Sequence, residues 1–147
     1  MYTRNSQAPV EEAMKRNKSR ILVADDHPGI LQQVADLLAP DFDVVGLAGH
    51  GMELLRMAEC LKPDLVVTDF QMPYVNGIHA GRELLRRQMC RAVVLLTMYE
   101  EQHLIDAARK AGILGFVLKS NAAQDLIPAV HAALNGRAYL PVMARTA

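Results

Sequence analysis

The sequence predicts an α/β protein, a doubly wound five-stranded parallel sheet covered by five helices. Short apolar segments alternate with longer segments of helical period, five times along the chain. The short segments are nearly unbroken apolar runs, which is typical of strands that are buried on both faces. The length of 147 residues, with 51% hydrophobic and 22% charged residues and no internal repeat, suits one globular domain.

The elements follow one another as five strand and helix pairs. The predicted strands are leucine-rich or β-branched and cover residues 21–24, 42–47, 65–68, 92–96 and 115–118. The predicted helices have apolar residues at helical spacing and cover residues 28–38, 51–61, 78–87, 101–111 and 122–134. In the last helix, Pro128 removes a hydrogen bond to Gln124. Asn121 with Gln124 suits an N-terminal capping box, which favours a kink over a late helix start.

Residues 1–19 form an N-terminal extension before the first strand. Glu11 and Glu12 stand four residues before Lys15 and Arg16, as in a short helix. A polar tail with local helical bias is an equally good interpretation, because so short a helix is marginal without tertiary contacts.

Composition excludes several classes of function. Lys plus Arg equals Asp plus Glu, 16 against 16, so we expect no direct DNA binding by this chain. No apolar run approaches a membrane span, and we expect no membrane interaction. Two cysteines, Cys60 and Cys90, cannot form a disulfide framework, which predicts reduced thiols and a cytoplasmic location. The histidines show no metal-ligand spacing, so none is expected to bind metal.

Polar residues follow four of the predicted strands. Asp25 and Asp26 follow the first, Asp69 the third, Thr97 the fourth and Lys119 the fifth. In open parallel sheets the ligand crevice lies beyond the carboxyl ends of the strands, so these side chains should converge. Three carboxylates repel one another unless a cation lies between them, and oxygen ligands suit Mg²⁺, with Mn²⁺ as an alternative. Such a site, with Lys119 opposite, can hold a phosphoryl group while one carboxylate attacks phosphorus.

Four strings carry a family resemblance: ILVADDHPG, DLVVTDFQMPYVNGI, VVLLTMYEE and GFVLKS. In this order and at these intervals they resemble the signatures of response-regulator receiver domains of the CheY-like kind, over about residues 20–136. The family implies a flavodoxin-like sheet with strand order 2-1-3-4-5. It also implies that Asp69 accepts the phosphoryl group, that Asp25, Asp26, Asp69 and the Gln71 backbone carbonyl hold the metal, and that Lys119 pairs with a phosphoryl oxygen.

The resemblance assigns a switch as well. Thr97 would move to meet the phosphoryl group, and Phe116, at the switch aromatic position, would then turn toward the core. Gln71 and Tyr99 would tune the lifetime of the phosphorylated state. His27 would only flank the first helix.

The strings DDHP, LTMYE and LKS together resemble the NarL/FixJ subfamily, which generally carries a LuxR-like helix-turn-helix domain after the receiver. Ser120 stands where many receivers have a cis proline, and a cis bond there would cost roughly 3 kcal/mol. Residues 136–141 resemble the boundary between receiver and linker, so residues 137–147 are expected to begin a linker or tail, without an output domain.

The implied function is two-component signalling. A sensor histidine kinase would be the donor, a homodimer could follow phosphorylation, and a full-length form could bind DNA. A stand-alone receiver or phosphorelay intermediate is the alternative. A phosphatase of the aspartyl-phosphate type would need an acid two residues after Asp69, where this chain has Gln71. An interaction module that is independent of phosphorylation would not need the acceptor, metal and lysine positions.

Overall fold

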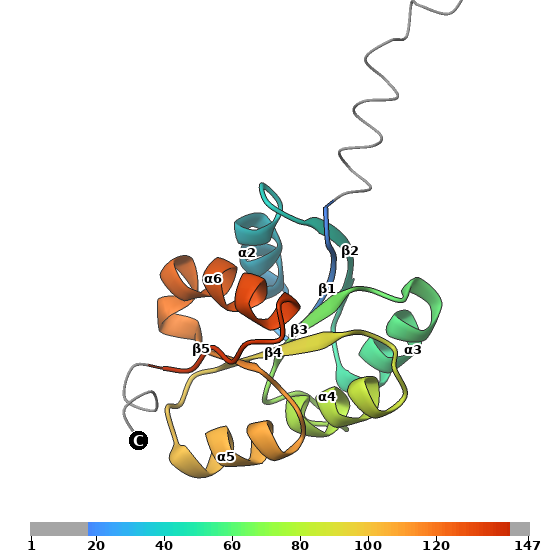
Figure 1. The fold of residues 1–147 in the computed structure, drawn as a ribbon. Helices are drawn as coiled ribbons and strands as arrows, with labels where there is room; N and C mark the ends of the chain where they lie inside the picture. Colours follow the sequence, from blue (N-terminus) through green and yellow to red (C-terminus); the bar gives the residue numbers. More distant parts are fainter. Residues whose placement is uncertain (1–17, 142–147) are drawn as a thin grey trace, which may run out of the picture.

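The computed structural model describes residues 18–141, which form a five-stranded parallel sheet between two layers of helices (Figure 1). The strands are β1 (Arg20–Ala24), β2 (Asp43–Ala48), β3 (Leu65–Asp69), β4 (Ala92–Thr97) and β5 (Gly115–Leu118). The helices are α2 (Pro28–Leu38), α3 (Gly51–Leu61), α4 (Gly77–Arg86), α5 (Gln102–Lys110) and α6 (Ala122–Leu134), with a 3-10 turn at Lys119–Asn121. The five predicted strand and helix pairs are therefore confirmed, with ends that differ by at most one residue.

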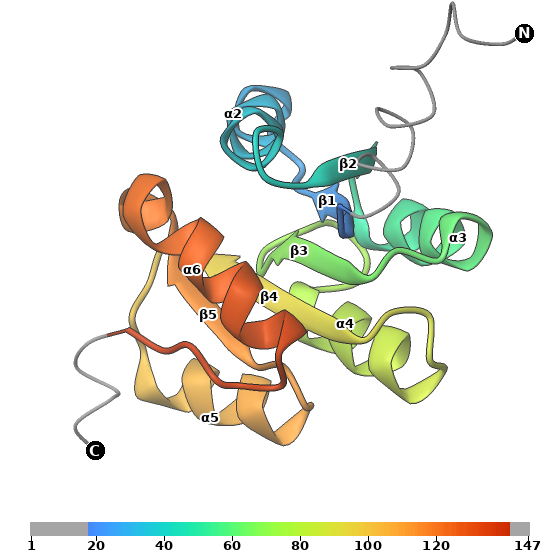
Figure 2. The ribbon, with the colours of Figure 1, turned by 45° about the horizontal axis from the view of Figure 1, so that its top comes forward.

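The strands are ordered β2-β1-β3-β4-β5, as the family resemblance implies. Helices α2 and α6 cover one face of the sheet, and α3, α4 and α5 cover the other (Figure 2). Successive residues of a strand point to opposite faces, so Ile21 and Val23 pack under α2 and α6, whereas Leu22 and Ala24 pack under the other three helices. The chain order reverses beside β1, between β1 and β3, which places the crevice at their carboxyl ends.

Strand β2 departs from the prediction that every strand is buried on both faces. It is an edge strand, and four of its six residues are only half-buried. Its register to β1 shifts between Ile21 and Leu22, which pair with Val44 and Gly46 and leave Val45 without a partner across the ladder. This extra residue is a β-bulge.

Contacts with the sheet continue past residue 136. Tyr139 forms a parallel bridge with Gly115 on the outer edge of β5. The Phe116 N–H donates to the Tyr139 carbonyl at 2.8 Å, and the Tyr139 N–H donates to the Leu114 carbonyl at 2.9 Å. The Tyr139 hydroxyl also lies 2.9 Å from Asp125 Oδ1 on α6. Tyr139 and Leu140 therefore pack against the core. The start of a linker or tail at residue 137 stays a prediction.

The start of α6 also differs in detail. The helix begins at Ala122 and continues through Pro128, so there is no late start, but Asn121 lies in the 3-10 turn and its side chain makes no capping hydrogen bond. The predicted capping box is wrong. No peptide bond within residues 18–141 is cis, and none of the helices there is long and apolar enough to cross a bilayer. The predicted helix or tail in the N-terminal extension lies outside the described residues, apart from residues 18 and 19.

Candidate functional site

Side chains from four strand ends meet at the carboxyl edge of the sheet. Asp25 directly follows β1, Asp69 and Thr97 are the last residues of β3 and β4, and Lys119 follows β5. Asp25, Asp69 and Thr97 are almost fully buried, with exposed fractions of 1%, 4% and 1%. Polar side chains inside an apolar sheet need partners, so their arrangement determines the chemistry of the site.

Lys119 joins two of these carboxylates. Its Nζ lies 2.9 Å from Asp25 Oδ2 and 3.1 Å from Asp69 Oδ1, and only 13% of its side chain is exposed. The ammonium therefore holds the two acids in place from the β5 side. Both ion pairs are largely shielded from solvent. Charges in the protein interior interact more strongly than charges at the surface.

The charges act on one another. Burial raises the pKa of Asp69, and the nearby charge of Asp25 raises it further, against the lowering effects of Lys119 and of a hydrogen bond from the Gln71 backbone. Burial disfavours the charged form of Lys119, but Asp25 and Asp69 outweigh this and raise its pKa. The cluster brings three carboxylates together with one ammonium, an arrangement that favours an additional cation.

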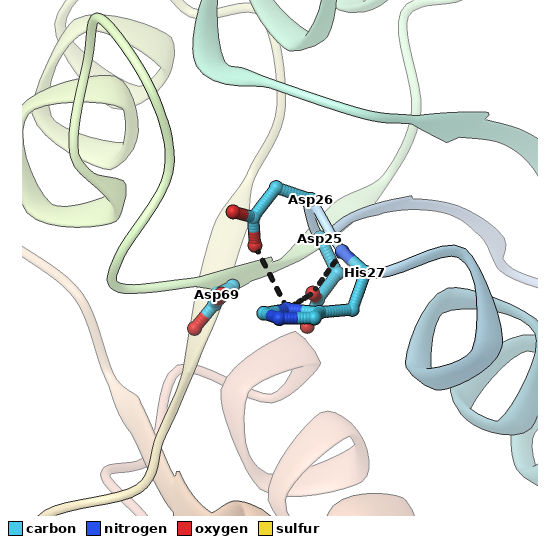
Figure 3. Close-up of side chains that lie close together, drawn as sticks. All are labelled: Asp25, Asp26, His27 and Asp69. Carbon is cyan, nitrogen blue, oxygen red and sulfur yellow. Dashed lines mark hydrogen bonds and ion pairs between the residues drawn. The ribbon is translucent and has the colours of Figure 1, made fainter.

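Asp26 and His27 complete the cluster at the start of α2. His27 Nδ1 lies 3.1 Å from Asp26 Oδ1 and 3.5 Å from Asp25 Oδ1, and the His27 N–H donates to Asp25 Oδ1 at 2.9 Å. Figure 3 shows the His27 ring turned back toward the carboxylates of Asp25 and Asp26, on the side of Asp69. The sequence assigned His27 only a flanking position. Its direct succession to two site aspartates was the signal that could have placed it here.

The residues present fit a bound divalent cation. One ligand atom from each of Asp25, Asp26, His27 and Asp69 lies within 4.8 Å of all the others. Asp25 Oδ2 is buried, and its charge partner is the Lys119 ammonium. Three carboxylates suit a hard cation such as Mg²⁺.

Thr97 and the residues after it form one wall of the site. The Thr97 Oγ1 accepts a hydrogen bond from the Tyr99 N–H at 3.2 Å. A pocket of about 80 Å³ lies between this wall, Asp69 and Lys119, and Gln71 and Tyr99 also line it. A larger hollow, about 520 Å³, opens at the other end of the sheet beside Pro63 and Arg91, away from the acids.

Phe116 lies in the core of the domain. It is 2% exposed and packs with residues of α5. Its backbone connects β5 to Tyr139. Its role as a switch residue stays a prediction.

Comparison with known proteins places the chain in a family. Residues 21–131 match the response regulator receiver domain. The chain is 34% identical over 128 residues to the transcriptional regulatory protein PdtaR of Mycobacterium tuberculosis, which covers 86% of this chain and 62% of that protein. It is 34% identical over 122 residues to the nitrate/nitrite response regulator protein NarL of Escherichia coli, 82% of this chain and 56% of that protein. The chain thus spans less than two thirds of the length of these relatives.

Similar solved structures are receiver domains as well. The receiver domain of the putative response regulator NarL from M. tuberculosis superposes with a TM-score of 0.76 at 28% identity, over 82% of this chain and 98% of that one. The isolated receiver domain of RcsB from Salmonella enterica, solved with the phosphomimetic BeF₃⁻, superposes with a TM-score of 0.78 at 27% identity, over 88% of this chain and 98% of that one. The chain therefore belongs to the response-regulator receiver domains of two-component systems, and its homologues are regulators of the NarL and DegU type.

Proposed function

We propose that Asp69 accepts a phosphoryl group from the phosphohistidine of a sensor histidine kinase. The observation that carries the proposal is the position of the Lys119 ammonium, 2.9 Å from Asp25 and 3.1 Å from Asp69 at the rim of a small pocket. This places a positive charge beside the acceptor oxygen, where the phosphoryl oxygens would come to lie.

In the transfer, an Asp69 carboxylate oxygen attacks phosphorus and forms the new P–O bond. The bond from phosphorus to the donor nitrogen breaks, and its electron pair stays on the imidazole, which takes a proton from solvent. Lys119 exchanges part of its contact with Asp69 for a phosphoryl oxygen. Because Asp69 is almost fully buried, water has limited access to the acyl phosphate that forms.

Asp25, Asp26, Asp69 and the Gln71 carbonyl would hold Mg²⁺, with Mn²⁺ as a substitute. The cation supplies charge neutralisation for the phosphoryl oxygens and for the crowded carboxylates. The protein contributes a site that is already formed by strand ends, so binding requires little rearrangement. The grouping of ligand atoms from Asp25, Asp26 and Asp69 within 4.8 Å of one another supports this role.

The signal would leave the site through Thr97 and Tyr99. A phosphoryl group on Asp69 offers the Thr97 hydroxyl a charged acceptor, and Thr97 would then release the Tyr99 N–H that it now accepts. Met98 and Tyr99 are exposed, so a change in this loop alters a surface that partners can contact. Coupling of this kind is typically worth about 1 to 3 kcal/mol. Gln71 and Tyr99 line the same pocket and would set the lifetime of the phosphorylated state.

The process that this receiver controls is proposed from its relatives. The PdtaR and DegU homologues are named transcriptional regulatory proteins, which supports a role in transcription for a longer form of this protein, in the cytoplasm. The net charge of zero argues that residues 1–147 alone do not bind DNA. A stand-alone receiver or relay intermediate would use the same acceptor but signal only through protein contacts, including a homodimer formed on phosphorylation.

The test is incubation with acetyl phosphate and Mg²⁺ followed by intact mass measurement. The parent should gain one phosphate, Asp69→Asn should gain none, and EDTA should abolish the gain. Asp36→Asn is the matched control, because Asp36 is an exposed carboxylate on α2 that contacts Gln32 instead of the site. Phosphate retained by Asp69→Asn, or transfer unaffected by EDTA, contradicts the proposal.

A further inference from the structure

The His27 imidazole is the one nitrogen ligand in the group of Asp25, Asp26, His27 and Asp69, and it has no part in the function proposed above. His27 Nδ1 lies 3.1 Å from Asp26 Oδ1 and 3.5 Å from Asp25 Oδ1, within the same group of four ligand atoms as Asp69. The other histidines among the described residues belong to no such group. His50 caps α3 by accepting the Glu53 N–H, and His103 pairs with the exposed Glu101.

The spacing suits neighbouring ligands of one ion. Transition-metal ions bind nitrogen and oxygen at about 2.0 to 2.2 Å, so two ligands at right angles around such an ion lie roughly 3.0 Å apart. The two distances from His27 Nδ1 are close to this value and need only small movements. The His27 side chain is 67% exposed, so its ring has room to make them.

The backbone of His27 is fixed while its ring is free. The His27 N–H donates to Asp25 Oδ1, and its carbonyl accepts the Leu31 N–H at 2.9 Å in the first turn of α2. Pro28 at the first helical position restricts the chain further. The Cβ is therefore held beside the cluster, and the ring can exchange a carboxylate for an ion by small torsional changes alone.

Imidazole changes which ions a site prefers. Carboxylate and carbonyl oxygens suit Mg²⁺ and Mn²⁺, whereas an imidazole ligand favours later first-row ions such as Co²⁺ and Zn²⁺. Resting on the metal site of the proposed function, we propose that His27 is a fourth side-chain ligand, and that it gives this receiver a preference for transition-metal ions over Mg²⁺.

The test is metal binding by the full 147-residue chain, first freed of metal with EDTA. Calorimetric titration with Mg²⁺ and separately with Co²⁺ gives both affinities, and the visible absorption of bound Co²⁺ reports its ligands. We expect Co²⁺ to bind at least tenfold more tightly than Mg²⁺. In His27→Ala the ratio of Co²⁺ to Mg²⁺ affinity should fall at least tenfold, and the Co²⁺ absorption band should shift. His103→Ala removes an exposed histidine that pairs with Glu101 and does not belong to the cluster, so it should change neither the affinity ratio nor the Co²⁺ absorption band.

The outcomes are distinct. An unchanged affinity ratio and Co²⁺ band in His27→Ala overturn the inference, and His27 is then only an ion-pair partner of Asp25 and Asp26. A ratio that depends on His27, together with no Mg²⁺-dependent phosphorylation of the parent, supports the nitrogen ligand and contradicts the proposed function instead. Circular dichroism of His27→Ala checks that the variant is folded, and His27→Gln is a second variant that keeps a polar side chain of similar length.

Discussion

Gly77→Ala should displace the backbone of Asp69, the proposed phosphoryl acceptor. Gly77 is the first residue of α4, and its N–H donates to the Phe70 carbonyl at 2.8 Å, directly after Asp69. A Cβ at Gly77 would press against the Asp69 carbonyl oxygen, closer than real Cβ atoms come, and would lie 3.0 Å from the Asp69 carbonyl carbon and 2.9 Å from Leu95 Cδ1. Two of these three atoms are backbone, so the strain has no flexible side chain to absorb it.

The size of the effect follows from the overlap. Carbon atoms are normally about 3.5 Å or more apart, so the contact with the Asp69 carbonyl carbon alone requires the Asp69 backbone and α4 to separate by at least about 0.5 Å, and the contact with the carbonyl oxygen requires more. Overpacking of this kind costs about 1 to 3 kcal/mol, and the rigid neighbours favour the upper end. With a urea m-value of about 2 kcal/mol/M, the unfolding midpoint should fall by about 1.5 M. A shift of 1 Å can cost about 100-fold in rate, so phosphorylation by acetyl phosphate should slow by about tenfold.

Gly29→Ala is the matched control. Gly29 lies near the start of α2, and a Cβ there would meet nothing within 4 Å. Because alanine is a better helix former than glycine, this change should raise the free energy of unfolding by up to about 1 kcal/mol and leave phosphorylation alone. If Gly77→Ala unfolds at the parental urea concentration and is phosphorylated at the parental rate, the close packing of α4 on Asp69 is not what positions the acceptor.

Three further predictions concern the switch, the acid cluster and the thiols. Thr97→Ala loses the acceptor for the Tyr99 N–H, so phosphorylation of this variant should leave the NMR shift of Tyr99 nearly unchanged, whereas a full response in the variant rules out this route. The pKa of Asp69 is raised in the fold, so its charged form destabilises the fold at pH values above that pKa. In urea at pH 7, Asp69→Asn should therefore have a larger free energy of unfolding than the parent. This difference must shrink as the pH falls through the pKa of Asp69. Burial raises the pKa of Cys90 to about 12, so one thiol per chain should react rapidly with a disulfide reagent at pH 8, and Cys60→Ser should remove that reaction.

The main features of the site could be predicted because they depend on strand order alone. Once the runs ending at Asp25, Asp69 and Thr97 are strands of one parallel sheet, their last side chains must share an edge. The position of His27 depends on a side-chain rotation, which no spacing in the sequence encodes. The core position of Phe116 depends on packing against α5, which is likewise a tertiary property.

The contact of Tyr139 with β5 could not be predicted from the sequence for a different reason. A single bridge at Tyr139 leaves no periodic pattern in the sequence from which that contact could be predicted. The capping box at Asn121 failed for a related reason, because the 3-10 turn that positions Lys119 takes Asn121 out of capping geometry. In both places a local pattern was overridden by contacts with distant parts of the chain.

The bridge at Tyr139 bears on how the edges of the sheet are protected from pairing with other chains. An open edge strand offers unpaired N–H and carbonyl groups to any other chain, which is a route to aggregation. At β5 the Phe116 N–H and the Leu114 carbonyl are already taken by Tyr139. At β2, the other edge, the bulge at Val45 breaks the regular ladder that an incoming strand would need. Both edges of the sheet are thus protected, one by the backbone at Tyr139 and one by the bulge at Val45, and removal of the segment that carries Tyr139 would leave β5 open to self-association.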